Sequence, residues 1–544
     1  MAKKNKDRSP SETTSSQSLE QLDKEVIRLL EKRARLLGRS ARGRQERQQS
    51  LVDPNREKSL WKTWLRELVE KGYEEKAVRA IFNGANALAY DAAETRTDWS
   101  FALRPQTGPV RVDLPGPLDI RLTRMWLALA ALSGSRLTIP GAVHNDAAFE
   151  LMKAFNQVGA TFSWDKSSLS HDGASSLDFN RKPIFVGQNS LNFYLLALAA
   201  AREPCSCKFT GSGVLKFMSM KPLSDIAPDL GARLVPLLPG GSGLPLRLEA
   251  SGEVAGSIHL PGETPLELGL ALAVAAPFSS GTPEEIHIAW SPAWRHAQGM
   301  ERAASMLESH LGVRRTDTGL SISANRAALP ESPDLPLDPF LSAYLLGLPA
   351  FAGGVVRLQG RFPDWLPEGR AALSLLGQAG LSIEFSDQVV TSTLPEDRLS
   401  PTELDCSGQA DLFPLGVALL VSCPQGTALR TPEAEQRDAA EELLQTLGYE
   451  SRPNDGTLAL GREHTGRGQE VSIYGHTPFW ILALALIALR RPHIVLKNPG
   501  DLTDLWPQFW SIYKGLPAPQ IGQKQANETK GADNVSKRRR RIVE

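Results

Sequence analysis

The chain has 544 residues with 61 basic and 61 acidic side chains, so its formal net charge is zero. A chain without net charge has no overall field that attracts nucleic acid or an anionic membrane. Its contents of 41% hydrophobic and 22% charged residues are usual for a globular protein large enough to hold several domains. Residues 1–17 are polar and lack a signal peptide's apolar core, and the longest apolar run, 481–489, is too short to span a bilayer. We therefore expect a cytoplasmic protein with a disordered N-terminal tail.

Four cysteines occur, at positions 205, 207, 406 and 423. They lack the spacing of a zinc site, and nothing in their number suggests a disulfide framework. The Cys205-x-Cys207 pair could bind a metal or change redox state, or the two thiols could be bystanders of the core. We expect neither a metal nor a cofactor.

The first structured part of the chain is predicted to be helical. Leucine and valine residues recur at three- and four-residue steps between Leu19 and Leu37, a spacing typical of an amphipathic helix. Two further amphipathic segments follow, 52–73 and 74–93, and Asp53-Pro54 has the form of an N-cap followed by a first-turn proline. Three helices in so short a stretch bury little surface alone, so we expect this arm, residues 18–94, to form a homodimer.

The arm resembles the helical (AroQ-type) chorismate mutase domain, a dimer that converts chorismate to prephenate. The resemblance rests on Asp53, Arg56 and Glu57, which match the D-x-x-R-E signature of the family. It further places Arg33 where the family binds a substrate carboxylate and Arg44 where a cation lies beside the ether oxygen. The reaction has a polar transition state that fixed cations stabilise.

Some positions depart from the mutase pattern. Ser16, Ala89 and Ala93 stand where the family has an arginine, a serine and a glutamine. Two interpretations of the arm therefore remain: a working mutase, or a dimerisation arm that is inactive or regulatory, in which the charged residues form solvated faces.

After a predicted linker, residues 95–107, the chain repeats one plan about six times. Each unit contains a strand, an Ala/Leu-rich helix, a second strand, a polar or amphipathic helix and a stop of the form Leu-Gly-Ala. Five stops centre on glycines, and a degenerate sixth unit ends near Gly515; the five are Gly159, Gly231, Gly312, Gly380 and Gly448. Six helical runs, such as 194–201 and 481–489, are apolar on nearly every side, which predicts buried helices.

This order of features, over residues 108–516, resembles 5-enolpyruvylshikimate-3-phosphate (EPSP) synthase. The resemblance implies an α/β fold: a two-lobed, inside-out α/β prism of six repeats, preceded here by the all-α three-helix arm. It also implies that the first strand of the body joins the last units in one lobe. Residues 517–544 form a polar tail whose basic run, 537–541, could touch RNA or an acidic partner, or simply be solvated and disordered.

EPSP synthases transfer enolpyruvyl from phosphoenolpyruvate to shikimate 3-phosphate with several cations, an acid and a base. The resemblance assigns substrate binding to Arg124 and Lys221 and catalysis to Asp411 and Glu433. Most other cation positions of the family carry neutral or acidic residues here; these are Leu118 or Asp119, Tyr194, Met218, Pro432, Gln436, Phe479 and Asp504, and Glu267 replaces the glutamine that contacts the shikimate phosphate.

Together the two resemblances predict a shikimate-pathway protein whose substrate is shikimate 3-phosphate, phosphoenolpyruvate or chorismate. One hypothesis is an EPSP synthase-type transferase fused to a chorismate mutase-like domain. The other is a catalytically impaired pseudoenzyme that acts as a scaffold or metabolite-binding regulator, with or without mutase activity. A related family, UDP-N-acetylglucosamine enolpyruvyl transferase, is less suitable because it needs a cysteine in a mobile loop.

Overall fold

The structure is a computed structural model of the whole chain. The residues that it describes are 22–34, 36–37, 54–75, 78, 81–82, 84–86, 100–103, 108–165, 168–173, 176–238, 243–278, 285–292, 294, 296, 299–300, 312–323, 329–395, 402–406, 409–424, 427–430, 434–454, 456–463, 470–475, 477–491, 493–497 and 499–516. No helix in these ranges is long and apolar enough to cross a membrane.

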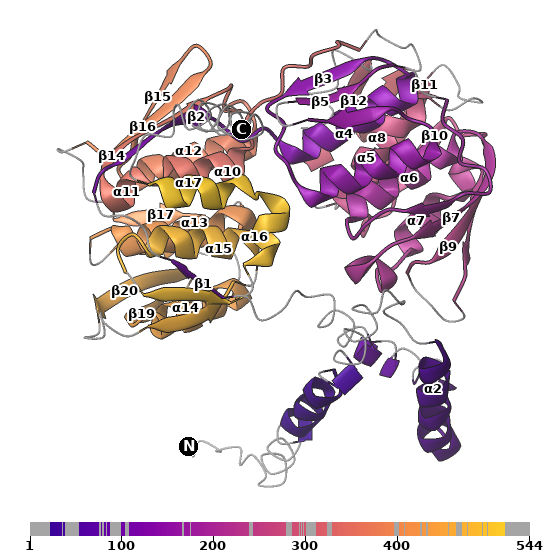
Figure 1. Cartoon of the computed structure of the whole chain (residues 1–544), viewed down its shortest axis with the longest axis horizontal. Helices are drawn as coiled ribbons and strands as arrows, with labels where there is room; N and C mark the ends of the chain where they lie inside the picture. Colours follow the sequence, from indigo (N-terminus) through magenta and orange to yellow (C-terminus); the bar gives the residue numbers. More distant parts are fainter. Residues whose placement is uncertain are drawn as a thin grey trace, which may run out of the picture.

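The body consists of two lobes, each with three small sheets on the outside and helices within (Figure 1). This arrangement confirms the predicted two-lobed α/β prism. The sheets of lobe 1 are β3-β5-β4 (Leu137–Pro140, Ser168–His171, Phe162–Trp164), β6-β7-β9-β8 (Pro183–Phe185, Pro204–Thr210, Leu246–Ser251, Ala232–Pro236) and β10-β11-β13-β12 (Ser257–Leu260, Glu285–Trp290, Gly319–Ser323, Val313–Thr316).

Lobe 2 combines the first strands of the body with its last units, as expected. Its sheets are β15-β16-β14-β2 (Ser382–Ser386, Val389–Thr393, Gly354–Gln359, Val110–Pro115), β17-β18-β20-β19 (Glu403–Asp405, Ala428–Arg430, Thr457–Glu463, Tyr449–Asn454) and β1-β22-β21 (Ser100–Leu103, Ile494–Lys497, Val471–Tyr474). Strand β2 lies parallel to β14, and β1 lies antiparallel to β22.

Strand β1 falls inside the segment that the sequence predicts as a linker, so residues 100–103 correct that expectation. The segment is short, which hides its alternation in the sequence. In the structure Leu103 is buried, and the ring of Phe101 lies 4.6 Å from that of Trp510. The chain thus joins lobe 2 before it reaches the first repeat.

Each lobe has a core of three central helices that are apolar on nearly every side, which confirms the prediction of buried helices. Those of lobe 1 are α4 (Ile120–Ser133), α6 (Ser190–Ala201) and α8 (Leu266–Ala275), and those of lobe 2 are α10 (Pro339–Leu346), α13 (Phe413–Ser422) and α15 (Pro478–Ile487). Leu195 in α6 and Leu484 in α15 have no exposed surface.

Amphipathic helices lie between the core and solvent. They are α5 (Asp146–Val158), α7 (Lys221–Ile226), α12 (Pro367–Gln378), α14 (Ala434–Thr446), α16 (Gly500–Leu505) and α17 (Gln508–Gly515), with the short α11 (Pro349–Ala352) after α10. All five predicted glycine stops have positive φ angles, from 55° at Gly231 to 118° at Gly159. Glycine suits these positions because other residues seldom adopt that conformation.

Two crossovers connect the lobes and pair with one another. Leu118 and Leu337 form an isolated antiparallel bridge. The Asp119 N–H donates to the Pro336 carbonyl at 3.0 Å, and the Asp338 N–H donates to the Pro117 carbonyl at 2.7 Å. The chain segments that enter α4 and α10 are therefore fixed side by side, which brings the first turns of these two helices together.

The arm contains helical residues 22–34 and 36–37, helix α2 (Pro54–Leu68) with a 3-10 turn (Val69–Lys71), and helical residues 81–82 and 84–86. Phe82 packs against both Trp61 and Trp64, at ring distances of 5.4 and 5.5 Å. On the first helix, Leu22, Ile27, Leu29 and Leu36 are each more than half exposed.

Candidate functional site: the cavity between the lobes

A cavity of about 80 Å³ lies where the two crossovers meet. Lobe 1 contributes the start of α4 and parts of α8, and lobe 2 contributes the starts of α10 and α12. Its lining comprises Asp119, Arg121, Leu122, Met125, Leu270, Gly299, Asp338, Pro339, Phe340, Leu366 and Glu368. The lining is mainly apolar, with three carboxylic acids and one arginine.

Two of these acids are helix caps. Asp119 precedes α4 and accepts a hydrogen bond from the Leu122 N–H at 2.8 Å. Asp338 precedes α10 and accepts from the N–H groups of Phe340 and Leu341 at 3.0 and 2.9 Å. Aspartate is a favoured N-cap because its side chain satisfies the free N–H groups of the first turn. The caps come from different lobes, yet the paired crossovers bring them to the same cavity.

The two cap carboxyls influence one another electrostatically. Burial, and next the nearby negative charge of Asp119, raise the pKa of Asp338 to about 7, although backbone hydrogen bonds and Arg121 act in the opposite direction. Burial also raises the pKa of Asp119, against the opposing effect of Arg121. Since burial and the charge of Asp119 both disfavour the ionised form of Asp338, Asp338 keeps part of its proton near neutral pH.

Arg124, which the resemblance assigns to substrate binding, lies inside lobe 1. Its Nη1 donates to the Asn189 carboxamide oxygen at 2.5 Å and, more weakly, to that of Asn192 at 3.4 Å. Burial, and next the charge of the neighbouring Arg121, lower its pKa to about 10, against the opposing charges of Asp119 and Glu267. Arg124 is 8% exposed and its Nε has no hydrogen-bond partner among the described residues. Asn189 also caps α6, so the arginine stabilises a helix start.

Lys221, the other predicted substrate-binding residue, begins α7. Its Nζ contacts both carboxylate oxygens of Asp225, at 2.8 and 2.6 Å, one turn further along the same helix. It does not line the cavity described above. The structure thus gives Lys221 a local partner on an exposed surface.

Asp411, a predicted catalytic residue, lies in the 3-10 turn Ala410–Leu412 before α13. Its carboxylate keeps contact with solvent, but partial burial raises its pKa and Arg121 lowers it. Arg121 is therefore the cation that acts electrostatically on Asp411, Asp119 and Asp338 alike.

Aromatic side chains occupy the end of lobe 2 beside Asp411. Phe479, in the first turn of α15, stacks on Tyr344 at 6.0 Å and meets Phe340 edge-on at 5.9 Å. Burial raises the pKa of Tyr344 far above its usual value, and the charge of Asp411 adds to the rise. Phe479 stands where the resemblance expects an arginine, so an apolar ring replaces a cation at this helix start.

A similar exchange affects lobe 1. Tyr194, at the position of another expected arginine, has its pKa raised to about 12 by burial and then by the charge of Glu267. Glu267 lies in the first turn of α8. At this end of lobe 1, Arg124 is hydrogen-bonded to Asn189 and Asn192, and the charges of Asp119 and Glu267 act on it electrostatically.

The remaining predicted residues belong to the arm or lie outside the described residues. Arg33 is half-buried; its guanidinium donates to the Ala85 carbonyl at 2.8 Å and to the Asn86 side chain at 2.6 Å, and lies 5.8 Å from the Trp64 ring. Arg56 and Glu57 belong to α2, but the structure describes only their backbone. Arg44, Asp53 and Glu433 lie outside the described residues.

Sequence reasoning missed Asp338 and Glu368. The Asp338-Pro339 dipeptide does carry a signal, because Asp followed by Pro is typical of a helix start. That signal identifies a cap, whereas the proximity to Asp119 depends on the crossovers and is not visible locally.

Comparisons with known proteins agree with this architecture. Residues 16–85 match the family model for chorismate mutase type II. Two relatives, both named 3-phosphoshikimate 1-carboxyvinyltransferase, come from Syntrophobacter fumaroxidans (24% identical, 76% of this chain and 99% of the relative) and Opitutus terrae (23%, 76% and 96%).

Among solved structures, EPSP synthase from Acinetobacter baumannii has a TM-score of 0.60 at 16% identity, covering 76% of this chain and 97% of that one. The enolpyruvyl transferase NikO from Streptomyces tendae has a TM-score of 0.54 at 14% identity, with the same coverages. The body is EPSP synthase-like, and the arm matches the chorismate mutase type II model. In the EPSP synthase-like body, the cavity lies between the lobes, where few positive charges remain.

Proposed function

We propose that this protein acts in the shikimate pathway, with its chorismate mutase domain as the catalytic part and its EPSP synthase-like body as a metabolite-binding partner that does not transfer enolpyruvyl. The observation that carries the proposal is the charge around Arg121. Arg121 is the one cationic side chain in the described lining of the cavity, which also contains Asp119, Asp338 and Glu368, so the cavity has an excess of carboxylates.

Binding two phosphorylated substrates requires the opposite arrangement. Phosphates and carboxylates are held by charge-assisted bonds from arginine and lysine, each worth about 1.5–3 kcal/mol. Here Lys221 already pairs with Asp225, and Arg124 is occupied by Asn189. Glu267 and Asp119 add repulsion where the resemblance expects neutral or basic groups, so phosphate affinity is expected to be low.

The second candidate is enolpyruvyl transfer itself. It is favoured by the extent of the similarity, because the chain covers 99% of the transferase from Syntrophobacter fumaroxidans. In this case Asp411 and Glu433 would serve as the acid and base, with Arg124 and Lys221 binding substrate after local rearrangement.

A phosphate-release assay with shikimate 3-phosphate and phosphoenolpyruvate separates the two candidates. We expect no release above the rate without protein, while the Acinetobacter baumannii EPSP synthase serves as positive control. Enzymatic release that disappears in an Asp411→Asn variant would overturn the proposal and establish the transferase.

The mutase part is supported by Arg33 and by the signature on α2. The guanidinium of Arg33 is held beside Trp64 and Asn86, between the helices of the arm. Fixed cations of this kind stabilise a polar transition state without covalent chemistry. Chorismate binding to Arg33 would require its contacts with Ala85 and Asn86 to be exchanged for the substrate carboxylate.

Chorismate disappearance, followed by absorbance, tests this part. We expect turnover in the whole protein and at least a hundredfold loss in Glu57→Ala, because a hydrogen bond to the substrate hydroxyl is removed. Glu67→Ala is the matched control, since Glu67 lies on the same helix, is 56% exposed and forms a surface ion pair with Arg66. Absence of turnover in the unaltered protein would favour the regulatory interpretation of the arm.

The arm would act as a homodimer. Its first helix exposes Leu22, Ile27 and Leu29, which a second copy would bury. Light scattering after gel filtration should give twice the monomer mass, and Ile27→Glu should give the monomer. A monomeric unaltered protein would contradict this part of the proposal. We also propose that the protein is cytoplasmic, as its sequence predicts.

A further inference from the structure

Two thiols lie on the same face of β7, in a part of lobe 1 away from the cavity between the lobes. Cys205 and Cys207 are two residues apart in an extended strand, so their side chains point to the same side. Cys207 is 2% exposed, and Cys205 is half-buried. The Cys205 thiol donates to the carbonyl of Ala200, at the end of α6, at 3.1 Å.

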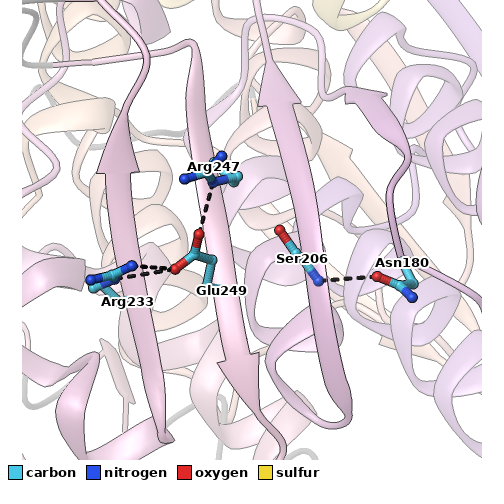
Figure 2. A network of polar contacts seen from close by, with 5 residues as sticks. All are labelled: Asn180, Ser206, Arg233, Arg247 and Glu249. Carbon is cyan, nitrogen blue, oxygen red and sulfur yellow. Dashed lines mark hydrogen bonds and ion pairs between the residues drawn. The ribbon is translucent and has the colours of Figure 1, made fainter.

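The backbone between the thiols is fixed on both edges. On one edge, Cys205 and Cys207 are in register with Ala250 and Leu248 of β9. On the other, the N–H of Ser206 donates to the Asn180 side chain at 3.4 Å, and its carbonyl accepts from the Arg181 N–H at 2.7 Å. Figure 2 shows the contact of Ser206 with Asn180, beside the ion pairs of Glu249 with Arg233 and Arg247 on the next strands.

A small cavity leads to the first thiol. It measures about 40 Å³, and Cys205, Asp178, Arg202 and Glu203 are among the residues that line it. A void of about 10–15 Å³ already admits one water molecule, so this one has room for a small ion. The Arg202 guanidinium in this cavity donates to the Leu132 carbonyl at 3.1 Å and pairs with Glu203 at 3.2 Å.

The two thiols differ in acidity because they contact one another. The hydrogen bond from Cys207 lowers the pKa of Cys205, although burial and the charges of Glu203 and Asp178 oppose this effect. The same bond and burial raise the pKa of Cys207. Cys205 is therefore the more acidic of the two thiols.

The strand geometry disfavours a disulfide between these residues. Two residues of extended chain span about 6.6 Å, and the parallel Cβ atoms stay about that far apart. A disulfide needs Cβ atoms roughly 3.5–4.5 Å apart. Closing that gap would break the pairing of β7 with β9, so the pair is better suited to hold something between its sulfurs.

We propose that Cys205 and Cys207 form a two-sulfur binding site for Cu(I). Among the described residues, no group of three or more metal-ligating side chains is found, so the ion must accept two ligands. Zinc prefers four, whereas soft thiolates select Cu(I). Binding converts two thiols and one Cu(I) into a dithiolate complex with one negative charge and releases two protons to solvent. No electron is transferred, and Arg202 offers a positive charge near the complex.

The test is an anaerobic titration of the reduced, full-length protein with Cu(I) in the presence of a coloured Cu(I) chelator. We expect one equivalent to be withheld from the chelator, with an ultraviolet sulfur-to-copper absorption band. Cys205→Ser and Cys207→Ser should each lower the affinity at least a hundredfold and abolish the band.

Controls keep the result interpretable. Cys423→Ser changes a half-buried thiol in lobe 2 and should retain the site. Because a hydroxyl at position 207 would be buried, Cys207→Ala is a second variant, and the thermal melting of every variant is compared without metal. Equal copper retention by the unaltered protein and both folded Cys207 variants would overturn the proposal, as would loss of the site in Cys423→Ser.

Discussion

The two lobes share one plan but differ in the side chains that each directs toward the other. Both have three sheets around three apolar helices. Lobe 1 retains a buried arginine, Arg124, bonded to asparagines, whereas the helix starts of lobe 2 carry Asp338 and the ring of Phe479. The comparison shows that the fold depends on the apolar central parts of the core helices. The charge at the helix ends can change without disturbing the fold.

The strongest test of this equivalence compares matched residues in the two cores. Leu195→Ala in α6 and Leu484→Ala in α15 each remove a fully buried side chain. We expect each to lower the free energy of unfolding by about 2–5 kcal/mol, measured by urea denaturation. Leu238→Ala, at a 54% exposed position, is the control and should have little effect. A large loss in only one lobe would show that the two cores contribute unequally.

A second test concerns the strand that closes lobe 2. Gly354 has a φ of +92°, and an added Cβ would lie 2.1 Å from the Val110 carbonyl oxygen of β2. Gly354→Ala should therefore cost more than about 2 kcal/mol, through strain and lost pairing.

Gly448→Ala is the matched control for that substitution. Gly448 also has a positive φ, of +86°, but nothing lies within 4 Å of the added Cβ. Only the conformational cost remains, about 1 kcal/mol. If thermal unfolding showed the same loss of stability for both variants, the close contact between β2 and β14 would not explain the effect of Gly354→Ala.

A third test uses pH at the junction of the lobes. The pKa of Asp338 rises from 3.8 to about 7 in the folded protein. The folded state thus keeps a proton that the unfolded chain releases above about pH 4, and stability should fall as pH increases from 4 to 7.

Asp338→Asn should remove this loss while preserving the cap of α10, because asparagine accepts the same N–H bonds. We compare the free energies of unfolding of the variant and the unaltered protein. Their difference should change in favour of the variant by on the order of 2 kcal/mol between pH 4 and pH 8. Denaturation at several pH values measures it, with the exposed Asp364→Asn as control. Parallel pH profiles for Asp338→Asn and the unaltered protein would contradict the assignment.

The smallest expected effect is at Lys221. Its pair with Asp225 joins a side chain that is 73% exposed to one that is 35% exposed. Lys221→Ala should change stability by no more than about 0.5 kcal/mol in a thermal melt. A larger change would indicate that Lys221 has a role in the packing of lobe 1.

Most of the fold was predictable because it depends on long, local patterns. Runs that are apolar on every side, such as 481–489, predict buried helices, and Gly159 and Gly231 mark left-handed stops whatever surrounds them. Strand β1 was missed because four residues carry too little alternation to be distinguished from a linker.

The site was less predictable, since it depends on residues that are distant in sequence. The resemblance assigned substrate binding to Arg124 and catalysis to Asp411. In the structure the charge of Arg121 acts on both residues, and their assigned roles remain predictions of function. The partnership of Asp119 with Asp338 arises only when the crossovers pair. No local pattern contains that information.

The pairing of β2 with β14 has a consequence for biosynthesis. When β2 leaves the ribosome, its neighbour β14 has not yet been translated, and all of lobe 1 comes between them. Lobe 1 can therefore fold as a continuous unit during translation. Meanwhile the apolar face of β2, with Val110 and Val112, remains exposed to solvent. Nascent chains arrested before Gly354 should thus be the ones that chaperones hold longest.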